Sequence, residues 1–104
     1  MSDNKKFPGL IRNLPAFAGP FDAYRLDADK CKVLFASYPA GTTIDAHTHP
    51  TENCGVITHG ELLLTVDGQE TRYGPGDWYH LHPEQLHAAR FELPTSEIEF
   101  WFDT

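Results

Sequence analysis

Residues 41–60 have the sequence GTTIDAHTHPTENCGVITHG, and this stretch decides the fold of the 104-residue chain. Side chains two positions apart leave a β-strand on the same face, so His47 and His49 are predicted to project together. An imidazole pair with this spacing can hold one metal ion. If His87 lies on a neighbouring strand, three neutral nitrogen donors converge on one point. The sequence therefore points first to a metal site.

Length and charge narrow the classes of function. A chain of 104 residues is long enough for one modest hydrophobic core and too short for two. The formal net charge is −7, and the eight Lys and Arg residues are scattered along the chain. No basic stripe tracks a phosphate backbone, so we expect no nucleic-acid partner.

The sequence also lacks signals for a membrane or for secretion. The longest run of aliphatic residues is only Leu62 to Leu64, and the first residues lack the apolar segment of a secretion signal. We therefore expect a cytoplasmic protein with no membrane partner. Cys31 and Cys54 are expected to stay reduced in that compartment.

Short runs rich in β-branched and aromatic residues predict an all-β fold. Eight glycines and eight prolines interrupt the chain too often for long helices. Asp67-Gly68 is a strong hairpin signal between two of the runs. Strands at this spacing predict an antiparallel sandwich or barrel. The predicted strands are 33–38, 56–59, 61–66, 69–73, 78–81, 86–93 and 97–102.

We divide the chain into an N-terminal arm, residues 1–22, and a β-barrel domain, residues 23–104. The arm carries large apolar side chains among three prolines, which favours an extended segment. In the last strand Ile98, Phe100 and Phe102 alternate with Glu97, Glu99 and Trp101. We expect Trp101 to face outward, together with Cys54 and Val56.

Two motifs in the right order resemble the cupin family. The first family motif matches Gly41, His47, His49, Asn53 and Gly60, and the second is built around Pro-Gly-Asp and a histidine. The second motif matches Pro75, Gly76, Asp77 and His87. Together they span residues 41–87, close to half of the chain.

The resemblance implies a jelly-roll β-barrel with one divalent transition metal per chain inside it, drawn from Fe, Mn, Ni, Cu and Zn. It implies His47, His49 and His87 as ligands, a small-molecule pocket, and a homodimer in which sheets of two barrels pack together. Where the family has a glutamate, this chain has Asn53, with Glu52 just before it. Parity along the strand favours Asn53 as the metal ligand, whereas a shift of one residue would substitute Glu52.

The other histidines have plainer interpretations. We expect His59 at a strand end and His82 in a loop. Gly55 falls on the inward face, and a glycine there is expected to leave room for a small molecule. No catalytic acid or base is evident within either motif.

Two functions of different class fit these residues. The first is a metal-dependent dioxygenase or isomerase that acts on a small oxygenated substrate. The second is a non-catalytic module that binds or senses a small molecule through the metal. The sequence leaves open whether the protein is an enzyme.

Overall fold

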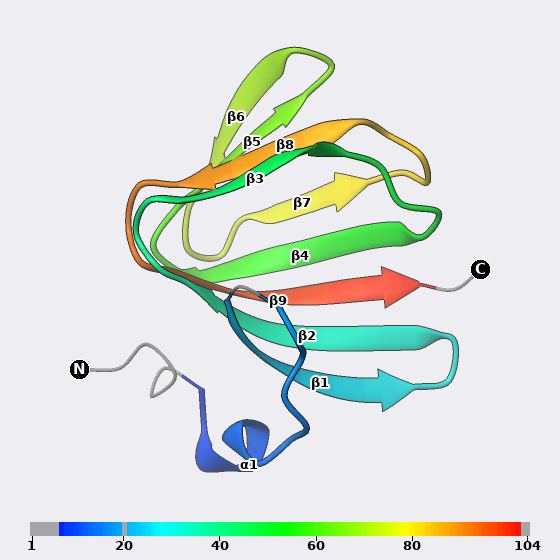
Figure 1. The fold of residues 1–104 in the computed structure, drawn as a ribbon, viewed down its shortest axis with the longest axis vertical. Helices are drawn as coiled ribbons and strands as arrows, with labels where there is room; N and C mark the ends of the chain where they lie inside the picture. Colours follow the sequence, from blue (N-terminus) through cyan, green and yellow to red (C-terminus); the bar gives the residue numbers. More distant parts are fainter. Residues whose placement is uncertain (1–6, 20, 103–104) are drawn as a thin grey trace.

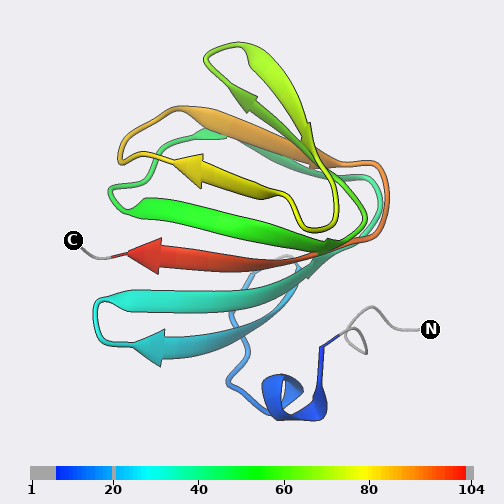
Figure 2. The same ribbon diagram turned by 180° about the vertical axis from the view of Figure 1, so that it is seen from behind.

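Two antiparallel sheets make up most of residues 7–19 and 21–102, the part of the chain that the computed structural model describes. One sheet has the strand order β1-β2-β9-β4-β7 and the other has the order β3-β8-β5-β6. The β5-β6 hairpin and the β1-β2 hairpin lie at opposite ends of the molecule (Figures 1 and 2). The elements are α1 (Gly9–Arg12), β1 (Asp22–Ala28), β2 (Cys31–Tyr38), β3 (Thr42–His47), β4 (Glu52–His59), β5 (Leu62–Val66), β6 (Gln69–Tyr73), β7 (Trp78–Leu81), β8 (His87–Phe91) and β9 (Thr95–Phe102).

The all-β prediction is confirmed, and the arrangement fits a jelly roll. Within the described residues neither sheet closes on itself, so the predicted barrel is a two-layer sandwich. β1 and β3 are absent from the predicted strand ranges, although the spacing of His47 and His49 implied a strand at the end of β3. The predicted Asp67-Gly68 hairpin is confirmed, and both residues have positive φ, 52° and 78°, as a two-residue turn between twisted strands requires.

The side chains of β9 face opposite to the prediction. Asn53 pairs with Trp101, and Gly55 pairs with Glu99, so these inward positions of β4 share a face with Glu99 and Trp101. Trp101 therefore points between the sheets and not outward. Ile98, Phe100 and Phe102 occupy the outer face of the five-stranded sheet instead.

Residues 7–19 and Phe21 pack against their own domain. Phe7 is buried and meets Phe35 edge to face with ring centroids 5.8 Å apart. Ala16 forms a β-bridge with Tyr24. Phe17 and Phe21 stack on one another at 5.8 Å and pack against the core. The predicted arm is therefore compact over this stretch, and its first six residues lie outside the described part.

Cys31 and Cys54 are free cysteines, and both are partly exposed. Among the described residues, no helix has the length and apolar character needed to cross a bilayer.

We predict that replacing Gly60 destabilises the protein for two reasons, its positive φ and the lack of space for a side chain. Gly60 and Gly68 both have positive φ, 80° and 78°, but a Cβ on Gly60 would overlap the Pro94 carbonyl oxygen, whereas nothing lies within 4 Å of one on Gly68. Gly68→Ala should cost about 1–2 kcal/mol of unfolding free energy from backbone strain alone. Gly60→Ala should cost about 1–3 kcal/mol more, because the β9 turn must move. Urea unfolding measures both, and equal losses would contradict the steric argument.

Candidate functional site

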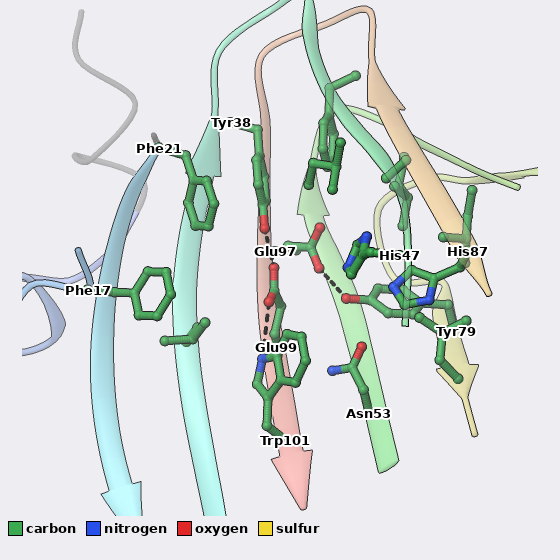
Figure 3. A pocket seen from close by; sticks show the side chains of 17 residues that line it. Phe17, Phe21, Tyr38, His47, Asn53, Tyr79, His87, Glu97, Glu99 and Trp101 are labelled. Atoms are coloured by element: carbon green, nitrogen blue, oxygen red, sulfur yellow. Dashed lines mark hydrogen bonds between the residues drawn. The ribbon is translucent and has the colours of Figure 1, made fainter. Parts of the chain in front are cut away.

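A cavity of about 240 Å³ lies between the two sheets (Figure 3). Its lining divides by chemistry. Aromatic and aliphatic side chains form one part, and polar side chains from both sheets form the other. The apolar part comprises Phe17, Phe21, Leu34, Tyr38, Ile44, Leu62, Leu64, Leu81, Ala89 and Phe91, and the polar part comprises His47, Asn53, Tyr79, His87, Glu97, Glu99 and Trp101.

The structure brings the three predicted histidines together. His47 at the end of β3 pairs directly with His87 at the start of β8, and their ring centroids are 4.3 Å apart. His49 lies just beyond β3, in the loop before β4, 4.8 Å from the ring of His87. His47 and His49 therefore come from a strand end and a loop, and not from one continuous strand face as predicted. One ring nitrogen from each residue falls in a group whose atoms all lie within 4.8 Å of one another.

Backbone hydrogen bonds fix which imidazole nitrogen is free. The Nδ1 atoms of His47, His49 and His87 lie 2.8, 3.2 and 2.9 Å from the carbonyl oxygens of residues 45, 51 and 85. A carbonyl oxygen only accepts, so each Nδ1 carries the hydrogen and each Nε2 keeps its lone pair. This arrangement is the usual support for a metal-bound histidine.

One of these nitrogens, His49 Nε2, is buried and makes no hydrogen bond among the described residues. An unpaired buried nitrogen is costly, and a metal ion would satisfy it. Burial also lowers the pKa of His87, and its hydrogen bond to the Gln85 carbonyl opposes this effect only in part. The three residues thus fit a divalent transition metal, which binds neutral imidazole.

Asn53 faces the cavity, and Glu52 does not. Asn53 is 2% exposed, and its Nδ2 donates a hydrogen bond of 3.0 Å to the Phe100 carbonyl oxygen. Its Oδ1 is therefore the atom left for a ligand in the cavity. Glu52 lies on the outer face of β4, where its carboxylate meets His80. This placement matches the parity argument for Asn53.

Two glutamates on β9 add chemistry that the sequence analysis missed. Glu97 and Glu99 are 2% and 5% exposed and project into the cavity (Figure 3). The Tyr79 hydroxyl donates to Glu97 Oε1 at 2.5 Å, and the Tyr38 hydroxyl donates to Glu99 Oε2. Trp101 Nε1 donates to Glu99 Oε1 at 3.2 Å. Among the described residues neither carboxyl forms an ion pair with Lys, Arg or His.

The pKa values of Glu97 and Glu99 differ because their surroundings differ. Burial, and then the charge of Glu99, raise the pKa of Glu97 well above its usual range. Burial also raises the pKa of Glu99, but hydrogen bonds from Tyr38 and Trp101 oppose this. Both carboxyls therefore hold a proton more readily than an exposed glutamate does, and the hydrogen bonds leave Glu99 the more readily ionised of the two.

Gly55 serves a different purpose from the one predicted. A Cβ at Gly55 would stand 2.5 Å from the Tyr79 hydroxyl and ring end, so the phenol occupies the space that the glycine leaves. Tyr79 is the cross-strand partner of Gly55, and its ring crosses β4 to reach Glu97 on β9. The Tyr79 phenol therefore fills the space beside Gly55 that was expected to accommodate a small molecule.

The only signal for Glu97 and Glu99 in the sequence is their alternation with apolar residues. That pattern places them on one face of β9 together with Trp101, but it does not say which face is buried. Pairing of Trp101 with Asn53 across the sheet settles the direction.

Comparisons with known proteins agree with this arrangement. The structure of KdgF from Halomonas sp. superposes with a TM-score of 0.80 at 15% identity, covering 94% of each chain. The DMSP lyase DddQ from Ruegeria pomeroyi gives 0.71 at 24% identity over 88% of this chain and 53% of that one. A variant of salicylate 1,2-dioxygenase from Pseudoaminobacter salicylatoxidans gives 0.74 at 16% identity over 85% of this chain and 28% of that one. These identities establish a shared fold only.

No curated protein sequence matches the chain. The cupin domain family model matches residues 34–99, which hold the three histidines, Asn53 and both buried glutamates. This match spans more than half of the chain, and it agrees with the two motifs and with the two-sheet fold. The chain therefore belongs to the cupin domain family.

Proposed function

We propose that this cupin domain is a metal-dependent enzyme that moves a proton on a small oxygenated substrate, as an isomerase does. The observation that carries the proposal is the pairing of each buried glutamate with a tyrosine hydroxyl in the cavity that His47 and His87 line. Buried carboxyls without cations are expensive and often mark functional sites. The similar folds of a lyase and a dioxygenase support an enzymatic use of such a cavity.

His47, His49 and His87 would hold the ion through Nε2, and Asn53 Oδ1 is the candidate fourth ligand. Three imidazoles and a neutral amide leave the charge of a dication uncompensated. When bound, such an ion supplies Lewis-acid polarisation of a substrate oxygen. The hydrogen bonds at the three Nδ1 atoms keep the rings oriented toward one point.

Glu97 and Glu99 supply the acid and base functions in this proposal. Glu97 keeps its proton because of burial and the neighbouring Glu99 charge, so it can donate to a substrate atom in the cavity. The Tyr38 hydroxyl and Trp101 Nε1 donate to Glu99 and offset part of its burial, so Glu99 ionises more readily than Glu97 and is the proton acceptor of the pair. Tyr79 orients Glu97 through its hydroxyl.

The cavity limits the substrate by size and polarity. Its volume of about 240 Å³ falls below the roughly 300–1,000 Å³ of typical ligand pockets. The polar side chains lie near the histidines, and the ring of Tyr38 stacks on Phe91 at 4.2 Å in the apolar part. We infer a substrate of few atoms with an oxygenated head toward the histidines and a small apolar remainder.

We further propose a homodimer that pairs the outer faces of the five-stranded sheets. Trp78 is 58% exposed and stacks on Phe100 at 5.9 Å, and Leu26 is 43% exposed on the same face. Cys54 and Val56, both predicted contacts, lie on this face, whereas Trp101 does not. Apolar exposure of this kind on one sheet face favours a protein contact.

The enzymatic proposal predicts proton exchange that depends on both halves of the site. Protein loaded with Mn(II) or Fe(II) should convert, or exchange with D₂O, a member of a panel of 1,2-diols, diketones and keto-sugars followed by NMR. Glu97→Gln should slow exchange by about 10²–10⁴-fold while metal content is unchanged, because only the proton donor is lost. His87→Ala should lose both the metal and the activity.

Glu92→Gln is the matched control, because Glu92 is an exposed carboxylate that accepts a hydrogen bond from Arg90. This variant should leave both the exchange rate and the metal content unchanged. Conversion that consumes oxygen and survives Glu97→Gln would favour the dioxygenase. Tight binding of a panel member without conversion would favour the binding module.

The dimer proposal predicts a mass of two chains in light scattering at micromolar concentration. Trp78→Asp should yield one chain, because it places a charge in the apolar contact. Leu93→Asp, at a leucine that is 51% exposed, should leave the dimer intact. A single-chain mass for the unaltered protein would contradict the proposal.

A further inference from the structure

A second group of metal-ligating side chains lies on the outer face of the five-stranded sheet. Glu52 begins β4, His80 lies in β7, and His82 follows the end of β7. One donor atom from each falls in a group whose atoms all lie within 4.8 Å of one another. The family motifs do not include His80 or His82, and the cavity chemistry does not use them.

The three side chains converge on one point. Glu52 Oε2 lies 2.7 Å from His80 Nε2 and 3.3 Å from His82 Nδ1. The two imidazole rings have centroids 4.6 Å apart and are inclined by 56°. A single carboxylate oxygen thus faces nitrogens of both rings, which brings two imidazoles and one carboxylate to the separation of ligands around one ion.

This group is separate from the cavity. Alternation along β4 sends Asn53 inward and Glu52 outward, so the two sets of donors lie on opposite faces of the sheet. The side chains of His80 and His82 are 51% and 66% exposed, and that of Glu52 is 37% exposed. Cys54 pairs with His80 across the strands, but its thiol is not part of the group.

The backbone also holds His82 in place. Gln85 Oε1 accepts a hydrogen bond of 3.1 Å from the His82 amide, and the Gln85 amide donates to the His82 carbonyl oxygen at 3.2 Å. The loop after β7 is therefore a closed turn, so His82 is presented beside β4 by a defined loop.

We propose that Glu52, His80 and His82 form a second metal site for a borderline divalent ion such as Zn(II), Ni(II) or Cu(II). Two imidazoles and one carboxylate suit these ions better than Mg(II) or Ca(II), which favour all-oxygen sites. Within a single chain, the exposed side leaves the other coordination positions open. Because β7 is the edge strand of its sheet and β4 is its one partner among the described strands, the ion would link the edge to its neighbour through side chains.

Zinc titration of untagged protein, freed of metal with EDTA, tests the second site by calorimetry. The unaltered chain should bind two equivalents. The double variant His47→Ala/His49→Ala should keep one, which belongs to the outer site. Adding His80→Ala to that background should weaken this remaining binding at least about tenfold. Glu52→Gln, which keeps volume and removes charge, should weaken it in the same way.

His59→Ala in the same background is the matched control, since His59 is exposed and belongs to neither group, and it should leave the remaining equivalent intact. Circular dichroism checks that each variant folds. If the His80→Ala variant does not fold, the zinc affinity of the Glu52→Gln variant decides the test. No zinc bound by the double variant, or unchanged binding in both His80→Ala and Glu52→Gln, would overturn the outer site. If the unaltered chain binds one equivalent of zinc and the double variant still binds one, the outer site stands and the cavity metal site is contradicted.

Discussion

The site depends on one constraint, which is the burial of Glu97 and Glu99 side by side on β9. No Lys, Arg or His among the described residues forms an ion pair with either carboxyl. A buried charge of this kind is unfavourable unless hydrogen bonds or protonation relieve it. Tyr38 and Trp101 satisfy Glu99, and Tyr79 satisfies Glu97. Tyr79 reaches Glu97 only because its cross-strand partner lacks a side chain, so the glycine at position 55 is part of the same arrangement.

The opposite sheet and its adjoining loop contribute the histidines of the site, whose ring nitrogens also need partners. His47 and His87 are direct partners across β3 and β8, and backbone carbonyls orient all three rings. His49 Nε2 is buried and has no partner in the described part of the chain, which makes it the counterpart of the buried carboxyls. An ion would satisfy the nitrogen, and its charge would act across the cavity on Glu97 and Glu99. The two sheets therefore bring together groups that neither could bury at low cost alone.

Much of the fold followed from the sequence because its signals are local. The hairpin at Asp67-Gly68 and the histidine spacing in residues 41–60 depend on turn chemistry and motif, and neither needs the far end of the chain. The facing of β9 could not be predicted in this way. Its two faces carry Ile98 and Phe100 on one side and Trp101 on the other, so apolar residues mark both, and pairing with β4 determines which is inside. Glu97 and Glu99 were missed for that reason, and Gly55 was misinterpreted because Tyr79 lies on another strand.

The most direct test of this account is the infrared spectrum of the metal-free protein in the region where protonated carboxylic acids absorb. If Glu97 holds a proton between the sheets, an acid carbonyl band should persist at pH 7, where exposed glutamates with a pKa of about 4.3 have ionised. The band should vanish in Glu97→Gln and remain in Glu92→Gln. Absence of the band at pH 7 in the unaltered protein, or its survival in Glu97→Gln, would contradict the proposed proton donor.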